Sequence, residues 1–517
     1  MSKRPRRMNI EVWILFLLVG ILLGKAHKDY QFYDPLVDIY EEISNHYVEE
    51  PDRRKLLKGA IEGMIETLDD PHTNYLSPED LAQFDKQTRG SFSGIGALIG
   101  VRNDQLTIIS PLEDSPAFEA GVLAGDAILE INGKPTEGFT ASDAVKLITG
   151  PEGSAVTLKV RHLNGETEVI KIERRKIKIQ TVKGYWRDKQ HHWDFMLDPE
   201  AKIGYVQLTQ FSGPTADEMH QAIVDLKKQG MKGLILDLRF NPGGLLTSAV
   251  EISDMFLEKG TIVSTRSARP GREEAARVES AKKDPKDLGE FPMIVLINES
   301  SASASEIVSG ALKDNGRAII LGTRSYGKGS VQQVRGLAGG NGAIKLTTAY
   351  YYLPSGRNLH RRSVSETWGV DPNDGFYVPM SFDQRQEMRR LRSEADVIKE
   401  DNGLKKDFRI SPEWLKTERK DLQLAAALVS MRNKLDTGKF KPVGDEKATL
   451  QAHINERKDY LKRREQFNEG LSKINQKLKE LDQKILKLQK NKVDAEKPAD
   501  AADAPKEKAP AEPAPAN

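Results

Sequence analysis

The sequence predicts a multidomain α/β protein with a layered α/β core, an inserted β-domain, an N-terminal helical cap and a C-terminal helical, coiled-coil extension. The apolar run from Met293 to Ile297 is short and uninterrupted, which is typical of a strand buried on both faces of a parallel sheet. Short strands separated by glycine turns fill residues 90–176, as in a β-domain. Beyond Gln384 the chain is highly charged and its apolar residues take helical spacing. A chain of 517 residues is long enough for several domains.

The composition excludes several classes of protein. Acidic and basic residues nearly balance, with a net charge of +2, so nothing indicates nucleic acid or an acidic substrate as a partner. The absence of cysteine excludes a cysteine protease, thiolate zinc sites and disulfides. The nine histidines form no H-E-x-x-H motif, and the G-x-S-x-G elbow of an α/β-hydrolase does not occur. We therefore expect no metal and no other cofactor.

The first 26 residues are predicted to be a signal peptide or a membrane anchor. Basic residues between Lys3 and Arg7 precede an uncharged apolar run from Val12 to Gly24. These 13 residues suit the hydrophobic region of a secretory signal better than a membrane span of about 20 residues. Cleavage after Ala26 and retention as an anchor both remain open. In either case we expect the rest of the chain to lie outside the cytoplasmic membrane.

Residues 27–88 are predicted to form a helical region. Apolar residues recur at helical spacing on two successive faces, first Leu36, Ile39, Tyr40 and Ile43, then Leu56, Leu57, Ile61, Met64 and Ile65. Pro71 interrupts this pattern within the sequence Asp70-Pro-His-Thr73. We expect these helices to pack on the α/β core as a cap.

The predicted core spans residues 177–383. Apolar strands at 203–208 and 234–238 flank a helical segment, which is the alternation of a layered α/β sheet. The next predicted strand ends at Asn298 and is followed by four serines, Ser300, Ser301, Ser303 and Ser305. These serines lie where a strand meets a helix N-terminus. Unpaired N–H groups and the helix dipole would stabilise a developing oxyanion there.

The next predicted strand, residues 318–321, is followed by a glycine-rich turn that contains Lys328. Parallel strands joined by a right-handed crossover place both turns at one edge of the sheet, so Lys328 is expected near the serines. A neutral Lys328 would take a proton from a serine, but its pKa must then fall by about three units from roughly 10.4, which requires burial. Two alternatives remain. One is a phosphate-binding loop, in which Gly329 replaces the Ser or Thr needed for magnesium, and the other is a capped helix beside a surface lysine.

Three motifs in this order resemble the carboxy-terminal processing, or tail-specific, serine proteases. They are Leu236-Asp-Leu-Arg-Phe-Asn-Pro-Gly-Gly244, Ser301-Ala-Ser-Ala-Ser-Glu-Ile307 and Tyr326-Gly-Lys-Gly-Ser-Val-Gln332, and the resemblance covers roughly residues 35–380. It implies that Ser303 is the nucleophile, Lys328 the general base and Gln332 the residue that orients the lysine. The residue pattern alone does not distinguish Ser303 from the neighbouring serines. The resemblance also implies an oxyanion hole formed by the backbone N–H of Ala304 and of either Gly243 or Gly244.

Residues 89–176 resemble a PDZ domain, which contains a G-D-x-I-L-x-I-N-G run like the one at 125–133. The carboxylate-binding loop corresponds to Gly94, Ile95, Gly96 and Ala97. Such a loop presents backbone N–H groups to a terminal carboxylate while the peptide adds a strand to the sheet edge. A plain β-domain with glycine hairpins is the alternative. In some relatives an arginine near the end of this domain couples peptide binding to the catalytic lysine, and Arg161 is the candidate here. The family also shows a turn like Asp70-Pro-His-Thr73 after its helical region.

The C-terminal region, residues 384–492, is predicted to be charged and helical. Apolar residues follow a three-four spacing at Phe467, Leu471, Ile474, Leu478, Leu481, Ile485 and Leu488. This stripe indicates either a seam for self-association or an adaptor, or a helix folded back on the domain. Residues 493–517 are rich in Ala, Pro, Lys and Asp and are predicted to be disordered.

Together these features predict an envelope serine endopeptidase with a Ser-Lys dyad. It would recognise apolar, free C-terminal tails of protein substrates through its PDZ domain and hydrolyse nearby peptide bonds without metal or nucleotide. The resemblance implies a bacterial cell envelope, with the enzyme periplasmic or anchored to the cytoplasmic membrane and facing outward. The alternative is a catalytically silent PDZ-containing envelope adaptor, against which the three filled catalytic positions argue.

Overall fold

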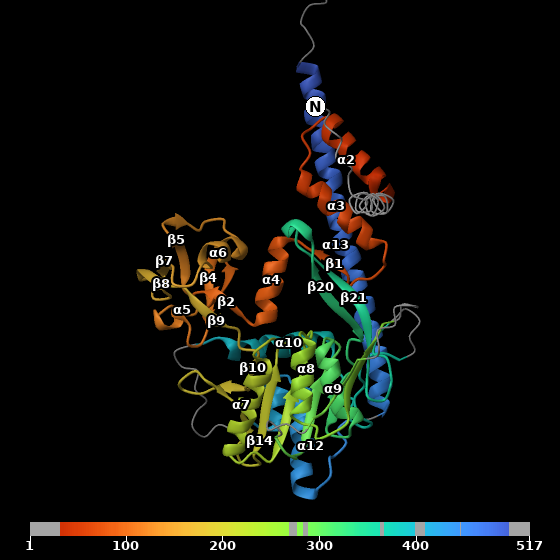
Figure 1. Cartoon of the computed structure of the whole chain (residues 1–517). Helices are drawn as coiled ribbons and strands as arrows, with labels where there is room; N and C mark the ends of the chain where they lie inside the picture. Colours follow the sequence, from red (N-terminus) through yellow and green to blue (C-terminus); the bar gives the residue numbers. More distant parts are fainter. Residues whose placement is uncertain are drawn as a thin grey trace, which may run out of the picture.

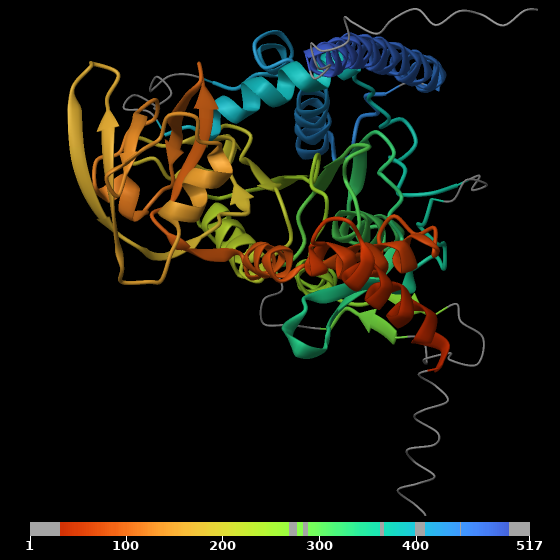
Figure 2. The ribbon, with the colours of Figure 1, turned by 90° about the horizontal axis from the view of Figure 1, so that it is seen from above.

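The computed structural model describes residues 31–267, 277–282, 288–361, 367–398, 409–444 and 446–495. Figure 1 shows an α/β core from which a long β-hairpin rises toward the N-terminal helices, with the β-domain to one side. Figure 2, seen from above, places the same β-domain beside the core. The apolar run from Val12 to Gly24 and the C-terminal tail from residue 496 lie outside the described residues.

The core is built on a mixed sheet of six strands. Its parallel strands, in order, are β14 (Ile203–Leu208), β15 (Gly233–Asp237), β18 (Met293–Ile297) and β19 (Ile319–Gly322). The short strands β10 (Val182–Lys183) and β13 (Met196–Asp198) pair with β14 in the antiparallel sense. All five residues of β15 and all five of β18 are buried, because layers of helices cover both faces of the sheet.

Three helices cover one face of this sheet, α7 (Thr215–Lys228), α8 (Leu246–Asp254) and α9 (Ala304–Asp314). The other face is covered by α11 (Pro412–Thr417) and α12 (Leu422–Thr437). Successive strand residues point to opposite layers, so Leu234 and Leu236 join the first apolar cluster and Ile235 the second. The C-terminal segment that was predicted to be a separate extension from residue 384 therefore supplies a layer of the core.

The structure describes a second sheet, of five strands. Its strands are β1 (Asn74–Leu76), β16 (Thr261–Arg266), β17 (Arg277–Ser280), β20 (Ser330–Gly336) and β21 (Ala343–Tyr352). The long hairpin of β20 and β21 rises from the core in Figure 1, and β1 adds to β21 with Asn74 opposite Lys345. The chain thus contributes a strand to the core before it enters the β-domain, which is an insertion.

The N-terminal region contains α2 (Asp34–His46), α3 (Arg53–Glu66) and α4 (Pro78–Arg89). Asp52 caps α3 and Ser77 caps α4 by accepting hydrogen bonds from backbone N–H groups of the first turn. The helices form as predicted, and α3 contacts β1, but α2 and α3 bury little apolar surface. The side chains of Leu36 and Ile39 are exposed, and neither helix has a buried residue.

The β-domain has its own sheet and apolar core. The sheet has the order β3 (Ala97–Arg102), β4 (Gln105–Pro111), β5 (Ala127–Ile131), β7 (Ala155–Arg161) and β8 (Thr167–Glu173), with β6 (Lys134–Pro135) beside β5. The helices are α5 (Pro116–Glu119) and α6 (Ala141–Ile148). The pair β2 (Ser91–Gly94) and β9 (Arg175–Lys178) closes the domain where the chain enters and leaves it.

The remaining elements are the hairpin of β11 (Trp186–Arg187) and β12 (Trp193–Asp194), α10 (Phe382–Ser393) and the long helix α13 (Glu446–Ala495). The predicted apolar stripe lies on α13, and its residues from Phe467 to Ile485 are exposed. The stripe is therefore not folded back on the core over that range. Of the helices that the structure describes, none is both long and apolar enough to cross a membrane.

Candidate active site

Ser303 lies at the tight turn between β18 and α9, at the N-terminus of the helix. Its backbone has φ 55° and ψ −114°, in a region that costs a residue other than glycine about 1–3 kcal/mol. The side chain is 5% exposed. A strained turn of this kind points a hydroxyl away from the sheet and beside the unpaired N–H groups of the helix.

The neighbouring serines have structural roles that Ser303 does not share. The hydroxyl of Ser301 donates to the carbonyl oxygen of Leu238 at 2.8 Å, and that of Ser305 donates to the carbonyl oxygen of Asn241 at 2.9 Å. The side chain of Ser303 instead forms a hydrogen bond with Tyr351. Among the buried serines of this turn, the structure thus distinguishes Ser303, which the residue pattern alone did not.

The predicted oxyanion loop packs directly against Ser303. A Cβ atom on Gly243 would lie 2.7 Å from the Cβ of Ser303 and 3.0 Å from the backbone nitrogen of Ala304. The N–H of Gly243 already donates to Oδ1 of Asn241 at 2.9 Å. The N–H groups of Ala304 and Gly244 donate to no acceptor among the described residues. This arrangement favours Gly244 over Gly243 as the second donor to an oxyanion.

A buried carboxylate joins the nucleophile turn to the lysine turn. Oε2 of Glu306 accepts the backbone N–H of Ser303 at 2.8 Å and that of Lys328 at 2.8 Å. The backbone nitrogens of Ser303 and Lys328 therefore lie close together, because they donate to the same carboxylate oxygen. Oε1 accepts the Gly327 N–H and the Ser325 hydroxyl, both at 2.6 Å. Burial raises the pKa of Glu306, and these four donors act in the opposite direction.

Lys328 has the electrostatic environment that a lysine base needs. Burial is the main cause that lowers its pKa, and the positive charge of Lys345 adds to the effect. Glu306 and Asp70 act in the opposite direction, and the resulting pKa is about 8. About one lysine in ten is then neutral at pH 7, whereas an ordinary lysine is almost entirely protonated.

Gln332 lies on β20, opposite Thr347 of β21. Its Nε2 donates to the hydroxyl of Ser330 at 2.8 Å and to the hydroxyl of Thr347 at 3.1 Å. Both hydrogens of the amide are thereby used on the sheet. The role of Gln332 in orienting Lys328 stays a prediction.

Sequence reasoning assigned no role to Tyr351, Glu306 or Asp421. Burial raises the pKa of Tyr351, which contacts Ser303, to about 12. Arg239, five residues before Gly244, is buried in ion pairs with Asp237 and Asp421, both at 2.7 Å. Glu306 could have been singled out, because it is the one acidic residue in the motif Ser301-Ala-Ser-Ala-Ser-Glu-Ile307. No local pattern points to Asp421, which begins a helix 182 positions away from Arg239.

The four residues of the predicted carboxylate-binding loop, Gly94, Ile95, Gly96 and Ala97, join β2 to β3. The carbonyl of Ile95 accepts from the N–H of Ala117, and that of Gly96 accepts from the N–H of Leu112, both at 2.8 Å. A trans peptide points its C=O and its N–H in opposite directions. The N–H groups of Gly96 and Ala97 therefore face away from the domain interior, as a carboxylate site requires.

Arg161, the predicted coupling residue, is not brought to the active site. It is exposed and donates to Oε1 of Gln105 within its own domain at 2.8 Å. The β-domain instead meets the core through Glu113, which pairs with Arg187 at 2.7 Å and accepts from Gln180 at 3.2 Å. A second contact joins the backbone N–H of Ile398 to the hydroxyl of Ser110 at 3.0 Å.

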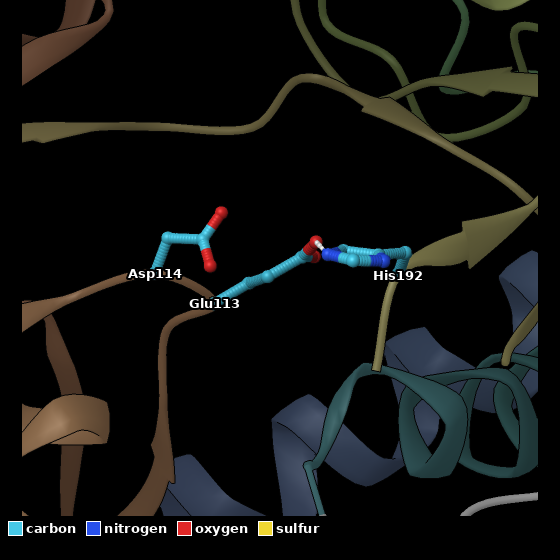
Figure 3. A group of neighbouring side chains, drawn as sticks. All are labelled: Glu113, Asp114 and His192. Carbon is cyan, nitrogen blue, oxygen red and sulfur yellow. Dashed lines mark ion pairs between the residues drawn. The ribbon is translucent and has the colours of Figure 1, made fainter. Parts of the chain in front are cut away.

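Figure 3 shows Glu113 with Asp114 and His192, which bring carboxylate and imidazole atoms within 4.8 Å of one another. His192 Nε2 lies 3.7 Å from Glu113 Oε1. The other Glu113 oxygen is paired with the guanidinium of Arg187, whose carbon lies 4.0 Å from the ring centroid of Trp193. Charge pairing with Arg187 and His192 across the domain junction accounts for the position of Glu113.

Comparisons with known proteins agree with the order of these parts. The family model "Peptidase family S41" matches residues 202–373, "Activating protease CtpB N-terminal domain" matches residues 25–80 and "PDZ domain" matches residues 107–162. A carboxy-terminal-processing protease of Bartonella bacilliformis is 43% identical over 364 residues, 67% of this chain and 80% of that protein. Carboxy-terminal processing protease CtpA of Bacillus subtilis is 35% identical over 332 residues, 64% and 67% of the two chains.

A solved structure, the photosystem II D1 C-terminal processing protease, is 31% identical, covering 66% of this chain and 86% of that chain, with a TM-score of 0.37. The sequence identities and coverage of the curated relatives establish the family. The chain belongs to the carboxy-terminal processing proteases of peptidase family S41, and it is a serine-type peptidase with a PDZ domain.

Proposed function

We propose that this peptidase is an endopeptidase of the cell envelope with a Ser303–Lys328 dyad and that it recognises the apolar C-terminal tails of protein substrates. The observation that carries the dyad is the Glu306 carboxylate, which holds the strained nucleophile turn and the lysine turn together. A serine at a helix N-terminus and a lysine with a pKa of about 8 are the two groups that such a dyad requires.

In this mechanism neutral Lys328 removes the hydroxyl proton of Ser303 as the oxygen attacks the scissile carbonyl carbon. The N–H groups of Ala304 and Gly244 stabilise the oxyanion of the tetrahedral intermediate. The protonated lysine then gives its proton to the leaving amine, which breaks the peptide bond and leaves an acyl-enzyme on Ser303. Lys328, neutral again, takes a proton from water, whose attack on the ester releases the carboxylic acid and restores the serine hydroxyl.

Tail recognition is supported by the free edge of β3. Within the described residues β3 pairs only with β4, and α6 packs beside it. Leu98 on β3 is 55% exposed and Val145 on α6 is 46% exposed, so an apolar side chain would bury surface against both. A peptide that adds to this edge would place its terminal carboxylate at the N–H groups of Gly96 and Ala97.

The envelope location rests on the sequence before the described residues. A basic N-terminus followed by an apolar run from Val12 to Gly24 suits export, with the chain either released into the periplasm or retained as an anchor. Fractionation of cells that express the full chain, followed by exposure of spheroplasts to an added protease, tests this location. Protection of the chain from the added protease would contradict it.

The dyad is tested with the full chain and a fluorescently labelled casein, an unstructured protein. We expect Ser303→Ala and Lys328→Ala each to abolish cleavage with the fold intact by circular dichroism, because the two groups act as a unit. Lys328→Arg should be equally inactive, since a guanidinium does not give up its proton. The matched control is Ser300→Ala, an exposed serine of the same cluster, which should cleave like the wild type. Cleavage by Ser303→Ala would overturn the proposal and indicate another nucleophile, whereas a wild type that cleaves nothing would favour the silent adaptor.

A further inference from the structure

The turn Asp70-Pro-His-Thr73, which precedes β1, contacts the catalytic sheet. The hydroxyl of Thr73 donates to Oδ2 of Asp70 at 2.6 Å, and it accepts the backbone N–H of Thr347 at 3.1 Å. The Asp70 carboxylate also accepts the N–H of His72 at 3.0 Å and a side-chain hydrogen bond from Thr347. A turn from the N-terminal region is therefore bonded to a residue 274 positions later in the chain.

The direction of these hydrogen bonds is determined by the chemistry of the groups. A carboxylate only accepts, so the single hydroxyl hydrogen of Thr347 is donated to Asp70. The Thr347 oxygen then has only lone pairs to offer Gln332, and it accepts a hydrogen from Nε2 at 3.1 Å. The hydroxyl of Ser330 accepts the second hydrogen of the same nitrogen at 2.8 Å. The amide of Gln332 is thus held with its nitrogen on the sheet, and its carbonyl oxygen accepts from no donor among the residues that the structure describes.

The same turn also contributes charge around Lys328. The groups that face the lysine are Asp70 and Glu306, which are negative, and Lys345 and His72, which are positive or ionisable. Burial and the positive charge of Lys328 lower the pKa of His72, so the imidazole is neutral at pH 7. Asp70 and Glu306 are therefore the two carboxylates among these four groups.

We propose that Asp70 and Thr347 are positioning residues of the catalytic pair, which fix the amide of Gln332 so that its oxygen, and not its nitrogen, is offered to Lys328. This inference rests on the proposed dyad. A neutral lysine donates to a carbonyl oxygen while its lone pair faces the serine, and an amide nitrogen in the same place would repel its hydrogens. The N-terminal turn is then a working part of the active site.

The test compares full-chain variants on labelled casein. Thr347→Val keeps the shape and removes the hydroxyl, and Asp70→Asn leaves one carbonyl oxygen for three donors. Each should lower kcat by about 10- to 100-fold, the usual effect of losing a hydrogen bond to a charged group, with little change in KM. Thr347→Ser, which keeps the hydroxyl, should restore most of the activity. The double variant should be no slower than Thr347→Val alone, because both changes interrupt one relay.

Two matched controls accompany these variants. Thr348→Val removes the next hydroxyl of β21, which is buried with no hydrogen-bond partner among the described residues, and Asp69→Asn neutralises the exposed carboxylate beside Asp70. Both should behave like the wild type. In addition, Asp70→Asn removes a negative charge facing Lys328, so its pH for half-maximal rate should move to lower pH even as the maximal rate falls. This shift tests only the charge of Asp70 on Lys328, whereas the loss of kcat in Thr347→Val and its rescue in Thr347→Ser test the positioning of Gln332.

Measuring Ser303→Ala in the same series separates two kinds of failure. If Ser303→Ala is inactive while Thr347→Val and Asp70→Asn cleave like Thr348→Val, the inference is overturned and the dyad stands. If Ser303→Ala still cleaves, both fail. An equal loss in Thr347→Ser and Thr347→Val would also overturn the inference, because the hydroxyl would then not be the group that matters.

Discussion

Replacing Lys328 by methionine should abolish proteolysis and at the same time stabilise the protein. The folded state holds this lysine with a pKa of about 8, against a reference value of 10.5. The difference corresponds to about 3 kcal/mol of preference for the neutral form. Because the amine is still partly exposed, solvent screening reduces the expected gain to about 1–2 kcal/mol. Methionine has a similar length and no charge to bury.

The pH dependence gives this prediction its sign. Between about pH 8 and pH 10.5 the unfolded chain holds a proton on Lys328 that the folded chain has lost, so wild-type stability rises with pH across this window. The advantage of Lys328→Met is therefore complete below pH 8 and disappears toward pH 10.5.

Urea unfolding of the wild type and of Lys328→Met at pH 7 and at pH 10 measures both quantities. The control is Lys259→Met, in which an exposed lysine is replaced and no gain is expected at either pH. A Lys328→Met protein that is no more stable than the wild type at pH 7, or whose gain persists unchanged at pH 10, would refute the reasoning.

Four further outcomes follow from the structure. The rate of casein cleavage should rise with pH and reach half its maximum near the Lys328 pKa of about 8, and a rate that falls above pH 7 in a pH series would indicate a different base. Asp421→Ala should lower the free energy of unfolding by about 3–5 kcal/mol in urea titrations, because it leaves the buried guanidinium of Arg239 with one carboxylate fewer. Gly244→Ala should be inactive although folded, since its Cβ would lie 1.9 Å from the carbonyl oxygen of Phe211, whereas activity near the wild-type level would remove Gly244 from the oxyanion loop. A peptide with an apolar end and a free carboxylate should accelerate cleavage of a second substrate if PDZ binding activates the enzyme, and its amidated form should not; inhibition by the free peptide would instead indicate simple tethering.

The sequence alone was sufficient for features that depend on neighbouring residues. The uninterrupted apolar run of β18 predicted a strand buried on both faces, and α7, α8 and α9 cover one face while α12 covers the other. Serines after a strand and before a helix predicted a nucleophile at a helix N-terminus, because that position follows from local hydrogen bonding. Three short motifs in order were enough to indicate the family.

Tertiary structure decided what depends on contacts between distant segments. The positive φ of Ser303 distinguishes it from Ser301 and Ser305, and so do the hydroxyls of those two serines, which donate to backbone carbonyl oxygens. The high charge of the chain beyond Gln384 suggested an extension outside the core, but Asp421 is buried against Arg239 and α12 covers the sheet.

The contact between Thr73 and Thr347 likewise has no signature in the sequence. Periodicity and capping report the nearest few residues along the chain, whereas a hydrogen bond across 274 positions depends on how β1 and the turn before it pair with β21 in one sheet. The sequence thus determined the parts of this protease, and packing determined which of their atoms meet.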